Sequence, residues 1–270
     1  MDAAPWHTAQ PVRPSRVRAA GPDYVSRMTE PGAAVVVGGA SGIGAAYVEA
    51  ERARGAAVLV LDVAGDLDVR CDVTDPASVD AAVAETIERV GVPTEVTVTA
   101  GVGHGGLLMD VSVEEWDRVI AVNTRGPLLV MRAFARTLMD AGTHGSIVAT
   151  SSVSARLIDR GMGPYCASKA ALSMLIGVAA QEWAPQGIRV NGVGPGVTRT
   201  PMLGRAPVEQ GWLKAVAGRT PLGRLGGPDD IADAIRALHD LGWVTGQVLE
   251  CDGGLGLHSP IDSFGEATRG

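Results

Sequence analysis

The sequence lacks the marks of several protein classes. Its 270 residues include three cysteines, Cys71, Cys166 and Cys251, and no Cys-x-x-Cys pair. We therefore expect neither a disulfide framework nor a structural zinc site, and a reducing, cytoplasmic setting fits this cysteine usage. No run of about 20 apolar residues is present, so no membrane span is predicted. The formal net charge of −7 argues against a nucleic-acid binder.

Lysine and aromatic residues are also scarce. Only Lys169 and Lys214 are lysines, so 21 of the 23 basic residues are arginines, and aromatic residues make up 4% of the chain. Hydrophobic residues reach 46% and charged residues 20%, which is an ordinary globular composition rather than a disordered one. A chain of this length can form one α/β domain with a large buried core.

The two ends of the chain differ from the rest. Residues 1–30 carry four arginines, no apolar periodicity and no apolar core of a secretory signal. We expect a flexible basic arm here; a transit-type peptide and a phosphate-binding arm are the alternatives, and Met28 is a second candidate start. Residues 259–270 form a polar tail, which we expect to lie over the surface or a neighbouring subunit.

Between these ends, over residues 31–258, short apolar runs alternate with segments whose apolar residues recur every three or four positions. The runs are rich in Val, Ile and Leu, as is typical of strands buried on both faces. The predicted strands are Ala33–Gly38, Ala56–Asp62, Val96–Ala100, Ser146–Ser151, Ile188–Val193 and Gln247–Cys251. The predicted helices are Ile43–Arg54, Ala77–Val90, Glu114–Met139, Tyr165–Trp183 and Asp230–His239.

Such alternation predicts a parallel sheet of about seven strands covered by helices on both faces, a three-layer, doubly wound α/β domain. One connection is unusual. Only nine residues separate Asp62 from Asp72, fewer than a parallel crossover usually takes. We therefore expect one helix to be nearly absent at this point.

A glycine-rich loop follows the first predicted strand and opens the first predicted helix. Its residues include Gly38, Ser41, Gly42, Ile43 and Gly44. Glycines in this position let the backbone approach a pyrophosphate at the helix N-terminus. A plain tight turn is the alternative, but the acid that closes the second strand favours dinucleotide binding.

That acid is Asp62, which lies eighteen residues after Gly44. A carboxylate there accepts hydrogen bonds from the ribose 2′-hydroxyl and repels a 2′-phosphate. Neither the glycine loop nor the residues immediately after Asp62 include Arg or Lys. The pattern therefore predicts NAD rather than NADP, with a solvated strand-end aspartate as the alternative.

Tyr165 and Lys169 stand four residues apart in a predicted helix, which places both side chains on one face. A free tyrosine, with a pKa of about 10, is a poor base near neutrality. A cation within about 4–6 Å lowers such a pKa by about one to three units. The pair therefore predicts a catalytic phenol assisted by an ammonium; an ordinary surface lysine is the alternative.

Two further polar residues accompany this pair. Ser152 ends a predicted strand, where a hydroxyl can hold a substrate oxygen beside the phenol. Ser151 competes for that role. Asn123 is a polar residue on a helix that otherwise looks buried, and alone it would be interpreted as a core amide.

Together these motifs resemble the short-chain dehydrogenase/reductase family in its single-domain form, over residues 32–256. The matching segments are the glycine loop, Cys71-Asp72-Val73, Ala100-Gly101, Val122-Asn123, Ser152, Tyr165-x-x-x-Lys169, the stretch from Asn191 to Met202, Pro221 to Leu225 and Thr245 to Gly254. The resemblance implies a Rossmann fold, a nicotinamide cofactor, no metal and a homotetramer.

The resemblance also implies a role for each matching residue. Tyr165 would be the general acid/base and Lys169 would hold the nicotinamide ribose and lower the tyrosine pKa. Ser152 would position the substrate oxygen, and Asn123 would hold a water in the proton relay. The other implied cofactor-binding residues are Asp72, Val73, Ala100, Gly101, Pro195, Gly196, Thr198 and Thr200.

Four features depart from the family pattern. Val37 precedes the first glycine where Thr is usual, and Val98-Thr99 replace a usual asparagine pair. The second replacement predicts a loss of polar links between the fourth strand of the family pattern and its neighbouring loops. The shortened second crossover and the basic N-terminal arm are the other two departures.

The substrate would be held by the loops above the nicotinamide and by a lid at about residues 201–220. Candidate contacts are His104, Ser154, Arg156, Met162 and Met202, which suit a medium-sized, partly apolar alcohol or ketone. The shortened second crossover and the residues from Arg160 to Tyr165 resemble features of cyclic dihydrodiol dehydrogenases. Relatives of steroid dehydrogenases also have a shortened second crossover. A non-catalytic NAD-binding sensor or scaffold is the main alternative function. An epimerase or dehydratase would need a larger C-terminal domain.

Overall fold

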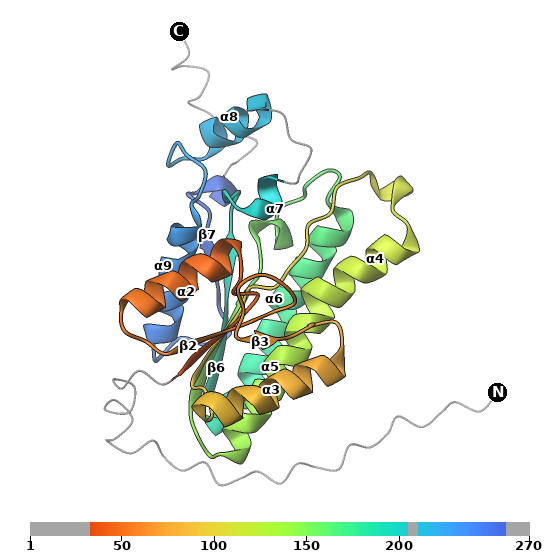
Figure 1. The fold of residues 1–270 in the computed structure, drawn as a ribbon. Helices are drawn as coiled ribbons and strands as arrows, with labels where there is room; N and C mark the ends of the chain where they lie inside the picture. Colours follow the sequence, from red (N-terminus) through yellow and green to blue (C-terminus); the bar gives the residue numbers. More distant parts are fainter. Residues whose placement is uncertain (1–32, 205–209, 258–270) are drawn as a thin grey trace, which may run out of the picture. The chain divides into compact units, whose positions relative to one another are not determined.

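A parallel sheet of seven strands organises the part of the chain that the computed structural model describes, residues 33–204 and 210–257 (Figure 1). Neighbouring strands run parallel in the order β3-β2-β1-β4-β5-β6-β7. The strands are β1 (Ala34–Val37), β2 (Val58–Asp62), β3 (Val69–Arg70), β4 (Glu95–Val98), β5 (Gly145–Thr150), β6 (Ile188–Pro195) and β7 (Val248–Cys251). The predicted doubly wound fold is confirmed. The predicted arm, tail and residues 205–209 of the lid lie outside the described residues.

Helices cover both faces of this sheet, as Figure 1 shows. One face carries α2 (Gly42–Ala53) and α9 (Pro228–Asp240), which pack against each other. The other carries α3 (Pro76–Val90), α5 (Gly126–Asp140) and α6 (Gly163–Trp183). Successive β1 residues point to opposite faces, so each face has its own apolar core. These two cores fix the sheet edge at which the functional loops emerge.

The segment predicted as one helix over Glu114–Met139 is helical throughout but not uniform. It consists of α4 (Val113–Ile120), a π-helical turn η2 (Ala121–Arg125) and α5. A π turn inserts one extra residue into the helix and is frequent at functional sites. Asn123, one of the predicted catalytic residues, lies in this turn and is fully buried.

The shortened second crossover is confirmed. Residues 63–68 between β2 and β3 contain no helix, and β3 has only two residues. Asp68 Oδ2 accepts a 2.8 Å hydrogen bond from Val60 N, which folds the short link back along β2. As a result Arg70 on β3 stands in register with Asp62 on β2.

The segments that follow β4, β5 and β6 gather at the carboxyl ends of the strands, the usual site of ligands in such sheets (Figure 1). They include the 3₁₀ turns η1 (Leu108–Asp110) and η3 (Val153–Ala155) and the short helix α7 (Pro201–Gly204), followed by α8 (Gln210–Arg219). Two more 3₁₀ turns are η4 (Ala184–Gln186) and η5 (Leu255–Leu257). Among the described helices, none is both long and apolar enough to cross a membrane.

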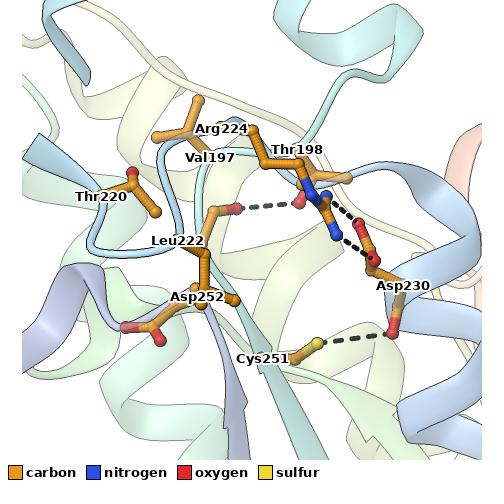
Figure 2. A pocket seen from close by; sticks show the side chains of 11 residues that line it. Val197, Thr198, Thr220, Leu222, Arg224, Asp230, Cys251 and Asp252 are labelled. Atoms are coloured by element: carbon orange, nitrogen blue, oxygen red, sulfur yellow. Dashed lines mark hydrogen bonds and ion pairs between the residues drawn. The ribbon is translucent and has the colours of Figure 1, made fainter. Parts of the chain in front are cut away.

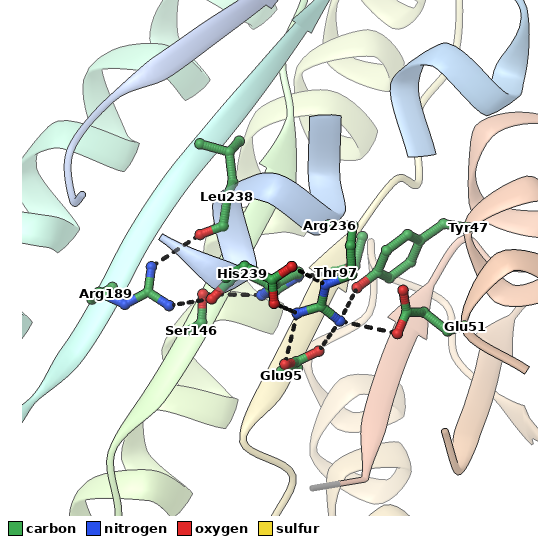
Figure 3. A network of polar contacts seen from close by, with 10 residues as sticks. Tyr47, Glu51, Glu95, Thr97, Ser146, Arg189, Arg236, Leu238 and His239 are labelled. Atoms are coloured by element: carbon green, nitrogen blue, oxygen red, sulfur yellow. Dashed lines mark hydrogen bonds and ion pairs between the residues drawn. The ribbon is translucent and has the colours of Figure 1, made fainter. Parts of the chain in front are cut away.

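A buried polar network lies at the opposite end of the sheet (Figure 3). Arg236 of α9 donates to both carboxylate oxygens of Glu95, each at 2.9 Å, and to Glu51 Oε2 at 3.0 Å. The neighbouring His239 is 3% exposed, and its ring nitrogens lie 2.9 Å from the hydroxyls of Thr97 and Ser146. The network ties α9 to the first residues of β4 and β5 and is structural.

This network predicts a pH-dependent stability. Burial lowers the pKa of His239 to about 3, from an ordinary value of about 6.5. Since the folded-state pKa is lowered, the ring is neutral in the folded protein and takes up a proton only on unfolding below about pH 6.5. We expect the unfolding free energy to fall by up to about 1.4 kcal/mol per pH unit between pH 6 and 5. Urea unfolding at pH 6 and at pH 5 measures this change in the unfolding free energy. The variant His239→Gln should lose most of this slope, and an unchanged slope would contradict the assignment.

Candidate active site

The glycine loop forms a cradle that tolerates no side chain at two positions. A Cβ on Gly38 would lie 2.4 Å from Ala100 N, and one on Gly44 would lie 2.2 Å from Gly38 O. Gly38 and Gly42 also adopt the left-handed region, with φ values of 87° and 56°. The loop therefore presses its backbone against the β4 turn, a close backbone approach of the kind that pyrophosphate binding uses.

The N-terminus of α2 keeps its first amides available. Ser41 is the N-cap residue, and its hydroxyl makes no capping hydrogen bond. Ile43, the second residue of the helix, packs against the apolar core on this face of the sheet. Unsatisfied amides and the positive end of the helix dipole make this terminus suited to an anion.

Asp62 ends β2 beside the glycine loop, as predicted. Its Oδ2 accepts from Ala40 N at 3.1 Å and its Oδ1 from Val63 N at 2.7 Å. Sequence reasoning missed a neighbour of this carboxylate. Arg70, in register with Asp62 on β3, donates to Val63 O at 2.5 Å. A guanidinium therefore lies next to the predicted ribose site, which local sequence could not indicate because β3 has only two residues.

The predicted adenine contacts follow β3. Asp72 accepts hydrogen bonds from the amide and hydroxyl of Thr74 at 2.9 and 2.7 Å, which hold the pKa of its carboxyl below the usual value. Val73 is buried, and a Cβ on Gly126 would lie 2.8 Å from Val73 Cγ2. This close approach joins the start of α5 to the predicted adenine side of the site.

The predicted loss of polar links after β4 is wrong at one position. Thr99 Oγ1 donates to Gly38 O at 2.9 Å and reaches Val37 O at 3.2 Å. A hydroxyl thus makes the connection that the asparagine pair was expected to supply. It holds the predicted Ala100-Gly101 turn against the glycine loop.

Asn123 is tied to the loop after β4 through its whole side chain. Its Oδ1 accepts from Val102 N at 2.8 Å, and its Nδ2 donates to Val102 O at 2.9 Å and to Ser168 Oγ at 3.1 Å. Ser168 lies on α6 next to Lys169. The amide therefore links three elements, α6, the π turn and the β4 loop, at one point.

Tyr165 and Lys169 share a face of α6, with Lys169 Nζ 5.8 Å from the tyrosine ring centroid. Lys169 is 3% exposed, and its ammonium donates to Thr150 O at 2.8 Å. A Cβ on Gly101 would lie 3.6 Å from this Nζ and 3.4 Å from Asn123 Oδ1. Asn123 and Lys169 thus meet beside Gly101, and the Tyr165 ring lies next to Lys169.

Burial sets the ionisation of the pair in the chain alone. It lowers the pKa of Lys169 to about 8. It also raises the pKa of Tyr165, while the Ser152 hydroxyl, by hydrogen bonding, acts in the opposite direction. The sequence predicts that Lys169 lowers the tyrosine pKa, but in the chain alone the Tyr165 pKa is raised, chiefly by desolvation, and the one group that lowers it is the Ser152 hydroxyl.

Two serines competed for the position at the end of β5, and their hydrogen bonds differ. Ser151 Oγ donates to Lys169 O at 3.2 Å and lies 2.7 Å from Ser173 Oγ, so it is used within the packing of α6. Ser152 Oγ accepts from Ser154 N at 3.1 Å, and its hydrogen bond to the Tyr165 phenol lowers the phenol pKa. Ser152 is therefore the serine beside the tyrosine.

The loop after β6 brings the predicted carboxamide contacts against the glycine loop. A Cβ on Gly42 would lie 3.6 Å from Thr200 Cβ, and one on Gly196 would lie 2.8 Å from Asp252 Cα. Pro195 is the last residue of β6. Thr198 Oγ1 donates to Gly196 O at 3.0 Å. The loop therefore contacts the start of α2 on one side and packs tightly against Asp252 on the other.

A pocket lies behind this loop (Figure 2). Arg224 donates to both carboxylate oxygens of Asp230, and together with Gly227 N it holds the pKa of Asp230 at about 2. Cys251 Sγ lies 3.4 Å from Asp230 O. These contacts join α9 to β7 and to the segment that carries Arg224. The residues that line the pocket therefore hold the loop around Thr198 in place from the side away from the glycine loop.

The predicted substrate residues lie around the same edge of the sheet but differ in the contacts that they make within the protein. Arg156 pairs with Glu250 at 3.1 Å, and Ser154 Oγ donates to Asp159 Oδ2 at 2.6 Å, so both have protein partners. Met162 is the N-cap residue of α6. Met202 on α7 lies near Gly103, whose Cβ would be 3.6 Å from Met202 Cγ. His104 is partly buried, and its side chain contacts Glu115.

Among the described residues, no cluster of three His, Cys, Asp or Glu side chains could hold a metal ion. The ionisable and hydroxyl groups that lie together at this edge are the Tyr165 phenol, the Lys169 ammonium and the Ser152 hydroxyl. This combination on a doubly wound sheet is typical of oxidoreductases that use a nicotinamide cofactor.

Comparison with known proteins agrees. The family model described as enoyl-(acyl carrier protein) reductase matches residues 32–256. A 2,5-dichloro-2,5-cyclohexadiene-1,4-diol dehydrogenase of Sphingobium indicum is 35% identical over 82% of this chain and 94% of its own length. A (3R)-3-hydroxyacyl-CoA dehydrogenase of Rattus norvegicus is also 35% identical, over 82% and 95%.

The fold comparison points the same way. A 3-ketoacyl-(acyl-carrier-protein) reductase from Brucella melitensis, solved in complex with NADH, has a TM-score of 0.77 and 29% identity over 84% of this chain and 99% of its own. The chain belongs to the short-chain dehydrogenase/reductase family and is an oxidoreductase that acts on alcohol groups.

Proposed function

We propose that this chain catalyses hydride transfer between NAD and a secondary alcohol or ketone of medium size and partly apolar character, with a cyclic alcohol as the preferred class. The observation that carries the proposal is the convergence of Asn123, Ser152, Tyr165 and Lys169 at the carboxyl edge of the sheet. A non-catalytic NAD-binding protein would have no need of this buried set.

The residues present fit a dinucleotide. The backbone of Gly38, Gly42 and Gly44 and the free first turn of α2 would hold the pyrophosphate, and Asp62 would hold the adenosine ribose. Asp72 and Val73 would face the adenine. Thr198 and Thr200 would hold the carboxamide, and Lys169 and Tyr165 the other ribose. When bound, the cofactor supplies the hydride acceptor.

The side chains would divide the proton chemistry among them. Ser152 would hold the substrate oxygen next to Tyr165, whose phenolate would remove the hydroxyl proton as the carbinol hydride leaves. Lys169 would stabilise that phenolate, because an ammonium at this distance favours the charged form. Asn123 would fix the loop after β4 and hold a water that passes the proton on.

The preference for a partly apolar substrate rests on side chains exposed near this edge. Leu107, Leu108 and Met109 follow the β4 loop and are exposed, and Ile158 is almost fully exposed in the loop after η3. Two relatives act, by their names, on a cyclic diol and on a hydroxyacyl thioester. Arg156, the basic side chain expected among the substrate contacts, is paired with Glu250 and is therefore already engaged by a carboxylate. We therefore favour an uncharged cyclic alcohol over a substrate that carries an anionic group.

The proposal is tested with purified protein by following NADH formation at 340 nm from a panel of cyclic and acyclic secondary alcohols and 3-hydroxyacyl thioesters. We expect turnover of cyclic alcohols with NAD. Turnover of the thioesters alone would refute the substrate class. Binding of NADH without turnover of any compound would refute the reaction and leave a binding protein.

Cofactor choice gives a second prediction. A carboxylate at position 62 repels a 2′-phosphate, so wild type should prefer NAD over NADP in kcat/KM by about a hundredfold. In Asp62→Ala the repulsion is lost while Arg70 remains beside the ribose site. We expect the preference to move toward NADP by about tenfold or more, measured by steady-state kinetics with both cofactors.

The double variant Asp62→Ala/Arg70→Gln is the matched control. It keeps the loss of repulsion but removes the guanidinium, so the gain in NADP use should shrink. Better turnover of wild type with NADP than with NAD would contradict the role given to Asp62.

A homotetramer is proposed on the family resemblance. It is supported by Met174 and Val178, which expose apolar side chains on the outer face of α6. Covering them in an assembly would remove apolar area from water.

A further inference from the structure

One side chain near the site has a buried nitrogen atom that makes no hydrogen bond within the described residues. His104 lies in the loop after β4, and its side chain is 6% exposed. Its Nδ1 lies 3.0 Å from Glu115 Oε1. Its Nε2 is buried and makes no hydrogen bond within the described part of the chain. A buried polar atom without a partner is rare in folded proteins, and a catalytic role or a bound water or ion is among its explanations.

The partner of His104 is held rigidly. Glu115 lies in the first turn of α4, whose start is fixed by a hydrogen bond from Glu115 N to Ser112 Oγ at 3.1 Å. In the usual capping arrangement the glutamate side chain turns back to the N-cap amide. Here its oxygens accept from Arg118 Nε at 2.8 Å and Arg118 Nη2 at 2.7 Å, and one also contacts His104.

These contacts fix the tautomer of the imidazole. Hydrogen bonds from Arg118 and His104 lower the pKa of Glu115 to about 2, so the carboxylate is ionised and can only accept. His104 Nδ1 must therefore carry the proton that joins the pair. In the neutral ring, Nε2 then holds a free lone pair, which can accept a hydrogen bond but cannot donate one.

The loop around His104 is tied to the reacting groups on both sides. Val102 pairs through its N–H and C=O with Asn123, and Gly106 N donates to Gly161 O at 2.9 Å, just before the helix that carries Tyr165. Gly103 faces Met202 of α7. Arg118 Nη2 also reaches Gly103 O at 3.4 Å. His104 is therefore held between the elements that supply the catalytic residues.

We propose that His104 Nε2 accepts a hydrogen bond from a second hydroxyl of the substrate, one that is not oxidised, so that the chain prefers a diol to the matching mono-alcohol. Glu115 and Arg118 are positioning residues, which orient the imidazole and fix its tautomer. The proposal rests on the proposed function for the reaction at the first hydroxyl, and it narrows the substrate class to diols and polyols.

The tautomer is tested directly by NMR of protein labelled with ¹⁵N-histidine, with His104→Asn used to assign the signals. We expect the His104 proton on Nδ1 and an unprotonated Nε2. Addition of cis-1,2-cyclohexanediol to the NADH complex should shift the Nε2 signal in the direction of an accepted hydrogen bond, and cyclohexanol should leave it in place. A proton on Nε2 in the free protein, or equal shifts with both compounds, would overturn the proposal.

Kinetics with the same two compounds give an independent readout. His104→Asn keeps an amide near the Nδ1 position, where it can still meet Glu115, but removes the acceptor at Nε2. The ratio of kcat/KM for diol over mono-alcohol should fall about tenfold or more, the effect of losing one such hydrogen bond. His104→Gln places an amide oxygen near the Nε2 position and should retain more of the ratio.

His144→Asn, in the loop before β5 at the other end of the sheet, is the matched control and should leave the ratio unchanged. An unchanged ratio in His104→Asn would overturn the diol site even if NAD is reduced normally. A diol-specific Nε2 shift without reduction of NAD would instead support the diol site and refute the proposed reaction. Neither shift nor reduction would refute both.

Discussion

Tyr165→Phe should slow oxidation by about 10³-fold while leaving the cofactor bound. The substitution removes only the phenolic hydroxyl, on a ring that is already packed beside Ser152 and Lys169. General acid/base catalysis typically contributes about 10²- to 10⁴-fold, so we expect kcat to fall by about 10³-fold. Stopped-flow formation of NADH measures the loss, and quenching of protein fluorescence by NADH measures binding.

Ser151→Ala is the matched control for this prediction. It removes a hydroxyl from the neighbouring position, but that hydroxyl contacts Lys169 O and Ser173 Oγ of α6 and should not affect the chemistry. Its activity should stay near that of wild type, whereas Ser152→Ala should lose activity. Retention of turnover by Tyr165→Phe would exclude the phenol as the acid/base.

Lys169→Met should lose activity and gain stability together. Loss of an ammonium near the phenol removes about one to three units of pKa lowering in the cofactor complex, so turnover near neutrality should fall by about 10- to 1000-fold. The apparent pKa of the rising limb of kcat should move up by at least about one unit. A pH profile of kcat distinguishes this effect from simple misfolding.

The gain in stability has a definite pH range. Burial lowers the pKa of Lys169 to about 8, below its unfolded value of about 10.5, so the charged form is disfavoured in the folded state. The penalty is fully present below pH 8 and disappears as the pH rises toward 10.5. At pH 7 it amounts to at most about 3 kcal/mol, which Met at this position would recover.

Urea unfolding at pH 7 and pH 10 measures this difference. Lys169→Met should be the more stable protein at pH 7, and the advantage over wild type should shrink at pH 10. A variant that is less stable at pH 7 would show that the hydrogen bond to Thr150 O outweighs the cost of the buried charge.

Most of the fold could be predicted because the strands are short apolar runs and the helices carry a clear periodicity. The π turn at Ala121–Arg125 could not, because one extra residue barely disturbs the apolar spacing of Glu114–Met139. The sequence predicts about seven strands but not the bounds of β3, because its two residues, Val69 and Arg70, are too few to form a pattern. Both features matter, since one carries Asn123 and the other brings Arg70 beside Asp62.

The candidate site divides in the same way. The glycine loop, Asp62 and the Tyr165–Lys169 pair follow from local spacing, and the structure brings them to one edge. Contacts across the chain could not be inferred, because they depend on tertiary packing. Thr99 reaches Gly38, and Glu115 turns from its own helix cap to His104.

Transfer of deuterium is the most direct test of the central claim, hydride transfer from a carbinol carbon to NAD. The protein is incubated with NAD and a set of cyclic secondary alcohols and diols that carry deuterium on the carbinol carbon, and the reduced cofactor is analysed by mass spectrometry. We predict one deuterium in the NADH formed by wild type and about 10³-fold less labelled NADH from Tyr165→Phe in the same time. Reduced cofactor without deuterium, or no reduced cofactor from any alcohol while NADH still binds, would contradict the account.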